Sequence, residues 1–452
     1  MSQGMLPNLP EPVDPPARPP TTRATARVRK PVRTQREWVE QDLESLLAPD
    51  HPARAIWGLL EGMDQEAFYA AIKAVLGVAG HPASDPQVLV ALWAYATVEG
   101  VGKARELDRL CHQHDAYRWL RGGVPVNYGL LAAFRVAHKA ALDDLLTQIV
   151  GCLLAAGAVS LKDAPVAQDG MRTRASAGAA SFRREETLEA CLEAAQQQVA
   201  RLAEEREHPD PGVSKRQQAA RERAAKEREA RVQQALDLLP QAQAAKERQQ
   251  ETLAKVKRER VTEPRVSTTD PEARVMKMPD GGFRPAYNVE FATVQAEGKA
   301  YGIIVGVSVT NEGTDAAQAA PMEAQVHRRT GEHPTTYLVD GGFATRDTIT
   351  TLEQRGVTVY APVRLPRNKP EAERYTPKPE DNPEVAAWRA RMATEEAKAV
   401  YQDRGRLAEW ANAQARRMGV TQLSVRGLDK VTSVLLWVAV GHNLLRWLAM
   451  GA

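Results

Sequence analysis

The stretch Tyr301–Thr310, YGIIVGVSVT, is an almost unbroken run of apolar and β-branched residues. A run of this length and composition predicts a β-strand. Around it, the pattern predicts a strand at 287–294, a helix at 315–328, a strand at 336–339, a helix at 345–354 and a strand at 357–363. Strands that alternate with helices predict an α/β fold, with a mixed or parallel sheet and helices on its faces.

Two aspartates stand where an expected strand stops and the chain turns. Asp169 lies in VAQDG, and Asp340 lies in YLVDGG. Carboxylates at the carboxyl ends of strands in an open α/β sheet face the usual ligand crevice, and the glycine after each one leaves the carboxylate uncrowded. Because Asp-Gly is also a common turn, one such pair is weak evidence, but two in the same sheet favour a functional site.

A third carboxylate would be needed to hold two hard cations, and the late helix YQDRGRLAEWANAQARRMG offers Glu409. Magnesium takes oxygen ligands and keeps several waters, so few carboxylates suffice. Two such ions, about 3.5–4 Å apart, stabilise both the attacking and the leaving oxygen of an in-line phosphoryl displacement. Arg416 lies on the same helix face as Glu409. The two residues are therefore either a metal ligand beside a phosphate clamp or a surface ion pair.

Other acids near the end of the chain fit this role less well. Glu395 and Glu396 lie in a polar run, RMATEEAKAV, which indicates solvated side chains. Asp403 stands beside Arg404 and before Gly405, and this pattern suits a cap at the start of a helix.

The remaining segments differ sharply in composition. Residues 1–36 are proline-rich and then basic, which predicts a disordered segment, either a solvated tail or a basic arm that touches nucleic-acid phosphates. Residues 37–160 have helical spacing broken by glycines, which suits a helix-turn-helix-like DNA reader or any helical bundle. Residues 183–262 are a charged insert with a heptad seam, a turn at 208–212 and a break at Pro240, which predict a coiled-coil-like hairpin with a solvated face.

Composition excludes several classes of protein. A chain of 452 residues fits two or three domains, and 43% hydrophobic residues can build sizeable cores. The net charge of +3, from 60 basic and 57 acidic residues, excludes a histone-like protein. Three distant cysteines exclude a disulfide scaffold and suit a reducing cytosol. We expect no signal peptide and no membrane span, since the most apolar stretch, 431–450, contains His442, Asn443 and Arg446 and predicts a buried helix.

Over roughly residues 48–449 the chain resembles the bacterial insertion-sequence transposases with a DDE catalytic core. The stretches HPARAIWGLLEGMD, DPQVLVALWAYATVEGVGKARELDRL and YRWLRGG resemble their helical N-terminal domain. VAQDGMRTRASAG and YLVDGGFATRDTI resemble the segments with the first and second catalytic aspartates, and GLDKVTSVLLWVAVGHNLLR resembles the closing helix. The family's Tyr-Arg-Glu-Lys/Arg signature is matched by Tyr401, Arg404, Glu409 and Arg416.

The resemblance implies an RNase H-like mixed-sheet core at 161–452, interrupted by the helical hairpin at 183–262, and a helical DNA-binding domain at 37–160. It implies that Asp169, Asp340 and Glu409 are catalytic and hold two Mg²⁺ (or Mn²⁺) ions. One ion would activate the water that frees a 3′-OH, and this hydroxyl would then attack target DNA with the help of the same metals. Residues expected to contact DNA or phosphate are Arg172, Arg174, Tyr401, Arg404, Arg406 and Arg416.

The identity of the assisting arginine is open at this point. Arg404 stands five residues before Glu409, where related subgroups have a spacing of four, and five residues correspond to about 140° around a helix. Arg406, three residues before Glu409, points more nearly with it. Arg416 stands where many relatives have lysine, and arginine binds phosphate bidentately.

The function implied is that of an insertion-sequence transposase, which binds terminal inverted repeats, cleaves the element's ends and joins the 3′-OH to target DNA. Its binding partner would be DNA, and it would act on DNA as a homodimer or higher oligomer. We would expect it in the bacterial cytoplasm, where it would act at the nucleoid. Two alternatives are a stand-alone metal-dependent nuclease with the same three acids and a catalytically inactive, DNA-binding remnant of a mobile element. The presence of all three acids argues against the remnant.

Overall fold

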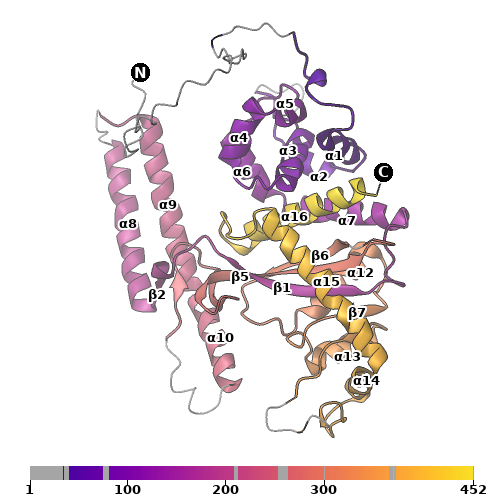
Figure 1. Ribbon diagram of the computed structural model, residues 1–452. Helices are drawn as coiled ribbons and strands as arrows, with labels where there is room; N and C mark the ends of the chain where they lie inside the picture. Colours follow the sequence, from indigo (N-terminus) through magenta and orange to yellow (C-terminus); the bar gives the residue numbers. More distant parts are fainter. Residues whose placement is uncertain are drawn as a thin grey trace, which may run out of the picture. The chain divides into compact units, whose positions relative to one another are not determined.

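A mixed β-sheet organises the protein (Figure 1). Within the described residues it has six strands: β1 (Val166–Arg174), β4 (Arg274–Lys277), β5 (Phe283–Gln295), β6 (Gly302–Thr310), β7 (Thr336–Leu338) and β8 (Thr358–Tyr360). The order is β6-β5-β1-β7-β8, with antiparallel pairing from β6 to β1 and parallel pairing from β1 to β8, while β4 pairs with β5 beyond the end of β6. This is the strand arrangement of the RNase H-like fold, so the predicted fold class is confirmed.

The computed structural model describes residues 34, 40–74, 81–207, 212–252, 263–299, 301–365, 370 and 373–450. Of the arm predicted at 1–36, only Thr34 belongs to them. Residues Leu43–Ala452 form one compact unit.

Helices precede the sheet in the chain, as predicted for residues 37–160. They are the short 3₁₀ helix η1 (Glu44–Leu46) and the α-helices α1 (Pro52–Glu61), α2 (Glu66–Tyr69), α3 (Pro86–Val98), α4 (Ala104–Gln113), α5 (Asp115–Arg121), α6 (Tyr128–Ala137) and α7 (Lys139–Ala155). Pro52 and Pro86 occupy first helical positions, where the missing N–H costs little. The Asp85 side chain accepts a hydrogen bond from the backbone N–H of Gln87 and caps α3.

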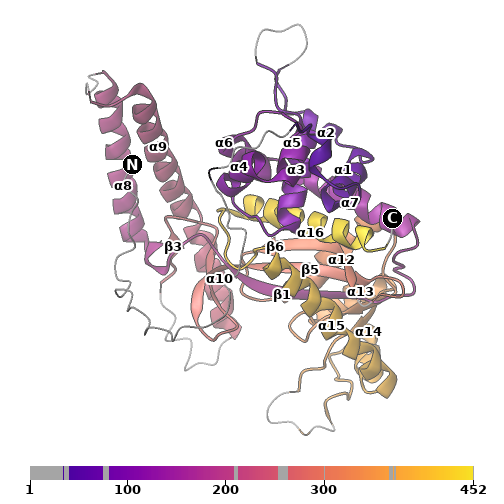
Figure 2. The same cartoon turned by 45° about the horizontal axis from the view of Figure 1, so that its top comes forward.

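The last helix, α16 (Leu428–Leu448), joins these helices to the sheet. It lies between the N-terminal helices and β6 (Figures 1 and 2), and its buried residues belong to one hydrophobic core shared by both parts. By length and composition alone α16 could cross a membrane, but 72% of its apolar window is buried inside the protein. The predicted buried helix at 431–450 is therefore confirmed.

Two side-chain amides bind the backbone of β6. Asn443 of α16 accepts a hydrogen bond from the Ile304 N–H (2.9 Å) and donates one to the Ile304 carbonyl (2.8 Å). Gln325 of α12 (Ala319–Thr330) makes the same pair of bonds with Val307, at 2.7 and 3.0 Å. These bonds fix α16 and α12 against the strand.

The insert between β1 and β5 is helical, as predicted. Its base is a two-stranded ribbon of β2 (Phe182–Arg183) and β3 (Val266–Ser267), reached through the short helix η2 (Ala179–Ser181). It contains α8 (Glu185–Glu207), α9 (Lys215–Asp237) and α10 (Leu239–Thr252), with α8 and α9 side by side (Figures 1 and 2). Pro240, at the second position of α10, separates α10 from α9, while most of the predicted turn at 208–212 lies outside the described residues.

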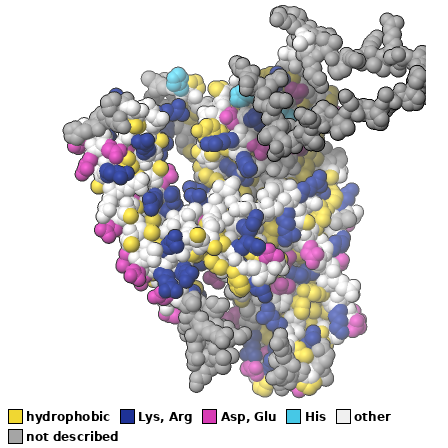
Figure 3. Space-filling view, turned by 60° about the vertical axis from the view of Figure 1, so that its left-hand side comes forward, with side chains coloured by type: hydrophobic (Ala, Val, Ile, Leu, Met, Phe, Trp, Pro, Cys, Tyr) yellow, Lys and Arg dark blue, Asp and Glu magenta, His cyan; other side chains and the backbone are white. Residues whose placement is uncertain are grey.

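The predicted heptad seam buries residues of α8 at intervals of seven: Leu188, Ala195 and Leu202. Across from them, α9 buries Ala225, Val232 and Ala235. Figure 3, which brings this side of the molecule forward, shows basic and acidic side chains interspersed over its surface. This mixture is typical of a solvated face.

Helices cover both faces of the sheet. On one face α12 packs so closely that a Cβ at Gly306 would lie 2.5 Å from the Met322 sulfur. On the other face lies the long helix α15 (Glu395–Arg417). Beyond β7 the chain adds α13 (Arg346–Gln354) and α14 (Pro383–Met392).

Candidate active site

The register of the parallel strands brings the two predicted aspartates level with each other. Ala167 of β1 pairs with Leu338 of β7. Two residues further along each segment stand Asp169 and Asp340, and side chains two residues apart point to the same face. Asp169 is not at the end of its strand, as the sequence suggested, because β1 continues beside β5 to Arg174. However, its parallel neighbour β7 stops at Leu338, so Asp169 still lies where the parallel part of the sheet ends.

Helix α15 covers the face on which both aspartates lie. Its Leu407 and Ala408 form a buried cluster with Ala167 and Leu338. The helix begins at Glu395, capped by Thr394, so the helix start expected at Asp403 is wrong. This earlier start makes α15 long enough to pass over the site as one continuous element.

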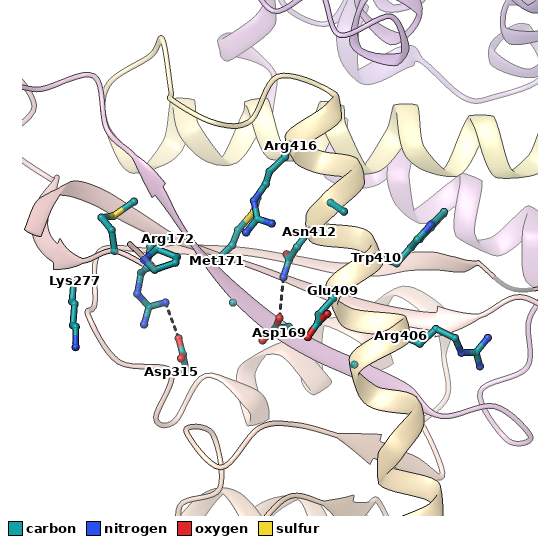
Figure 4. Close-up of a pocket in the computed structure, with 15 residues that line it drawn as sticks. Asp169, Met171, Arg172, Lys277, Asp315, Arg406, Glu409, Trp410, Asn412 and Arg416 are labelled. Atoms are coloured by element: carbon teal, nitrogen blue, oxygen red, sulfur yellow. Dashed lines mark hydrogen bonds and ion pairs between the residues drawn. The ribbon is translucent and has the colours of Figure 1, made fainter. Parts of the chain in front are cut away.

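Both oxygens of Asp169 are hydrogen-bonded to α15. Arg404 Nη2 donates to Oδ1 at 2.8 Å. Asn412 Nδ2 donates to Oδ2 at 2.9 Å (Figure 4). Burial raises the pKa of Asp169 above its usual range and the nearby Asp340 and Asp315 carboxylates add to the rise, while Arg404 opposes it. The arginine that reaches the first aspartate is therefore Arg404, whereas Arg406 bonds to Gln295 (3.0 Å) and Asp403 (3.3 Å).

Glu409 extends from α15 between these two donors. It is exposed, and among the described residues it has no hydrogen-bond or ion-pair partner. Glu409 and Asp169 line the same pocket of about 830 Å³, and Figure 4 draws them next to each other. Gly405, one turn earlier, also lines this pocket and places no side chain beside the Glu409 carboxylate.

Asp340 is held by its own backbone. Its Oδ1 accepts a hydrogen bond of 2.5 Å from the Gly342 N–H, which is an Asx-type turn. A Cβ at position 342 would lie 2.7 Å from that same oxygen, so a larger residue there would displace the Asp340 carboxylate. Unlike Asp169 and Glu409, Asp340 does not line the 830 Å³ pocket.

The acids are close to one another without forming a closed metal site. In the part of the chain that the structure describes, no three His, Cys, Asp or Glu side chains converge closely enough to hold a metal ion as they stand. Arg404 supplies a physical reason, because its positive charge already pairs with the Asp169 carboxylate.

Sequence reasoning missed a further acid at the site, Asp315. The predicted helix at 315–328 begins only at Ala319, and Asp315 lies in the preceding loop, which contains Ala317 at φ 64°. Asp315 Oδ1 accepts hydrogen bonds from Arg172 (3.0 Å) and Asn288 (2.8 Å), and Asp315 lines the same pocket as Asp169. No pattern in the sequence distinguished Asp315 from an ordinary polar residue near a helix start.

Gly170, the residue after Asp169, lies directly against the Asp315 side chain. A Cβ at position 170 would lie 3.0 Å from Asn288 Oδ1 and 3.1 Å from Asp315 Oδ1. A larger residue at position 170 would therefore require the Asn288 and Asp315 side chains to shift.

A buried polar network lies on the face of β1 opposite Asp169. Glu290 is fully buried and accepts hydrogen bonds from Gln168 (2.6 Å) and Asn288 (2.8 Å), while the Tyr337 hydroxyl donates to Gln168 (2.8 Å). Burial raises the pKa of Glu290 to about 8, so this side chain carries a proton through most of the neutral range.

The other predicted DNA contacts are divided between the pocket and its surroundings. Arg406 and Arg416 are exposed and line the pocket together with Lys277 of β4 (Figure 4). The Arg172 guanidinium also lines it but is bound internally by Asp315 and Asn288.

Two predicted contacts lie outside the lining of the pocket. Arg174 donates to Gln422 at 3.3 Å. Tyr401 is half-buried near Arg404, and burial raises its pKa.

Comparison with known families matches the C-terminal part of the chain. Residues 366–448 match the family model described as "Transposase DDE domain". The matched segment contains α14, α15 and α16, and with them Arg404, Glu409 and Arg416, but not the strands that carry Asp169 and Asp340. No curated protein and no solved structure matches the chain.

Proposed function

We propose that the protein moves an insertion sequence by binding the element's terminal inverted repeats, cleaving its ends and joining the 3′-OH to target DNA. The match of residues 366–448 to a transposase DDE domain supports this proposal. The observation that supports the proposal is the placement of three acids that come from three separate segments. Asp169 and Glu409 line one pocket, and Asp340 is level with Asp169 on the neighbouring parallel segment.

Transposases of this family use divalent metal ions, and the donors present here fit Mg²⁺ or Mn²⁺. All of them are hard carboxylate oxygens. Among the described residues Glu409 has no partner, and the pKa of Asp169 is raised by burial and by nearby carboxylates. A bound cation would pair with Glu409 and stabilise the ionised form of Asp169. Asp169, Asp340 and Glu409 would hold the ions. Two bound ions would supply activation of the attacking oxygen and stabilisation of the leaving oxygen in an in-line displacement.

The protein's own side chains would bind and orient the DNA. Arg406, Arg416 and Lys277 line the pocket and have the charge to hold phosphates. Arg404 would neutralise Asp169 in the metal-free protein, and it has the charge to bind a phosphate. Arg172 would act indirectly, because it positions the Asp315 loop.

Recognition of the element's ends would fall to residues 37–160, with the basic arm 1–36 adding phosphate contacts that are independent of sequence. The shared core between these helices and α16 supports a rigid connection between DNA binding and chemistry. The protein would act as a homodimer or higher oligomer on DNA in the bacterial cytoplasm.

A joining assay with the purified full chain tests this function. The substrates are a labelled duplex that ends in the element's inverted repeat and a supercoiled target plasmid, with Mg²⁺ present or chelated. A transposase joins the label to the plasmid only with metal and only from the repeat-ended duplex. Cleavage without joining would favour a stand-alone nuclease, and binding without cleavage would favour an inactive remnant.

A further inference from the structure

We propose that Asn412 is a positioning residue for the reaction, which holds Asp169 in the orientation that binds metal. This inference rests on the proposed function only in taking Asp169 as a metal ligand. It concerns a residue that neither the acid motifs nor the arginine signature includes.

The first observation is geometric. Asn412 stands one helical turn after Glu409 on α15, so one rigid element carries both side chains toward Asp169. Asn412 Nδ2 donates to Asp169 Oδ2 at 2.9 Å (Figure 4). The amide must present its N–H₂ to the carboxylate, because its oxygen could only face another acceptor.

The second observation is that Asn412 is unfavourable for the fold alone. The residue is 4% exposed, and its Oδ1 is buried without any hydrogen-bond partner. Burying an unpaired amide oxygen is destabilising, and asparagine is a weaker helix former than leucine or alanine. The nearby buried positions of α15 hold Ala408, Ala411 and Ala415. The polar side chain at 412 is therefore explained by its contact with Asp169.

The third observation is the contrast between the two donors on Asp169. Arg404, on Oδ1, is a cation, and it would be repelled by a divalent ion at the same carboxylate. Asn412, on Oδ2, is neutral and can keep its hydrogen bond when the ion arrives. We therefore assign Arg404 as the exchangeable partner and Asn412 as the permanent one.

The test uses the full chain with Asn412→Leu, which has a similar volume and no donor. Three quantities are measured: Mn²⁺ affinity without DNA, by calorimetry or by the Mn²⁺ spin-resonance signal; the denaturation midpoint; and cleavage of end DNA as a function of Mg²⁺ concentration. We expect Mn²⁺ affinity to fall about 10- to 100-fold, as for other residues that orient metal ligands. The midpoint should be unchanged or higher, and raised Mg²⁺ should restore part of the cleavage.

Gln414→Leu is the matched control, because it makes the same kind of amide-to-leucine change two residues further along the helix, away from Asp169. It should leave all three quantities as in the wild type. Asn412→Ala is the second variant and is used if the leucine protein does not fold, because alanine is smaller than asparagine and cannot clash. The same loss of Mn²⁺ affinity is expected.

Unchanged Mn²⁺ affinity in a folded Asn412 variant would overturn the inference, and a lower midpoint with unchanged affinity would assign the residue a structural role only. A wild-type protein that binds Mn²⁺ but cleaves no DNA would contradict the proposed function, while weaker Mn²⁺ binding by Asn412→Leu would still support the inference. A wild-type protein that binds no Mn²⁺ would overturn both.

Discussion

Arg404 Nη2 donates a hydrogen bond of 2.8 Å to Asp169 Oδ1 and joins residues that are 235 positions apart in the chain. The arginine side chain is 14% exposed and the aspartate 20%, so water screens the pair only partly. In the structure the positive charge beside the first predicted catalytic acid comes from the protein itself.

Replacing Arg404 should make folding stability more dependent on metal. Arg404→Ala removes the positive charge that lowers the pKa of Asp169 and leaves the partly buried carboxylate without its charged partner. The free energy of unfolding without metal should therefore fall by about 1–3 kcal/mol. Added Mn²⁺ should restore more stability to this variant than to the wild type, because the ion no longer competes with an arginine. Denaturant unfolding with and without Mn²⁺ measures both effects. Arg406→Ala, on the same helix but bonded to Gln295, is the control and should show neither.

Removing any of the three acids should abolish cleavage while DNA binding persists. Asp169→Asn, Asp340→Asn and Glu409→Gln each keep the size of the side chain but lose the charge that would hold metal. The loss of cleavage rate should exceed the 10- to 100-fold loss that is typical when a residue hydrogen-bonded to a metal ligand is replaced. Cleavage and gel-shift assays on the same end DNA measure the two activities. Glu396→Gln, an exposed acid at the start of α15, should cleave normally; full cleavage by Glu409→Gln would show that the third acid lies elsewhere.

The buried Glu290 should make stability fall as pH rises from about 4.5 to about 8. Its folded-state pKa of about 8 lies above the unfolded value, so the folded protein binds the extra proton in this window. The slope from this one group should approach 1.4 kcal/mol per pH unit in the middle of the window. Glu290→Gln mimics the protonated side chain and should flatten this part of the curve of unfolding free energy against pH. An unchanged slope in Glu290→Gln would mean that the carboxyl is ionised in the folded state.

The shared core of α16 should make the N-terminal helices and the sheet unfold together. Leu435→Ala removes a fully buried side chain of α16 and should cost about 2–5 kcal/mol. Val275→Ala, at a residue that is 48% exposed, should change stability by less than about 0.5 kcal/mol. Tryptophan fluorescence and far-UV circular dichroism should report one coincident transition for each protein. Two separated transitions would show that the helices 37–160 are an independent domain.

Deleting residues 1–36 should weaken binding to every duplex by a similar factor. The segment contains seven basic residues, and contacts with phosphates release counterions without reading sequence. The slope of log affinity against log salt concentration should become shallower, while the ratio of affinities for end DNA and random DNA should stay constant. A change in that ratio would mean that the arm reads sequence.

The order of strands and helices could be predicted from the sequence because each depends on local periodicity. The two Asp-Gly pairs were visible for a similar reason, since the two residues of each pair are adjacent in the sequence. Asn412 and Asp315 could not be found in this way. Their contacts join positions 243 and 143 residues apart, and only the docking of α15 and of the Asp315 loop brings these positions together.

The assisting arginine shows the limit of helical geometry used alone. Spacing favoured Arg406, because it points more nearly with Glu409. In the structure Arg404 donates to Asp169, whereas Arg406 donates to Gln295 and Asp403. The direction that matters depends on where the helix crosses β1, and this crossing is a long-range property of the fold.

The amides of Asn443 and Gln325 have a consequence for assembly. An edge strand normally presents free N–H and C=O groups that can recruit a strand from another molecule. On β6 the outward groups of Ile304 and Val307 are already used by these two side chains. Two copies of the protein therefore cannot continue the sheet across β6 at these residues, and the dimer proposed to form on DNA would need a different contact surface.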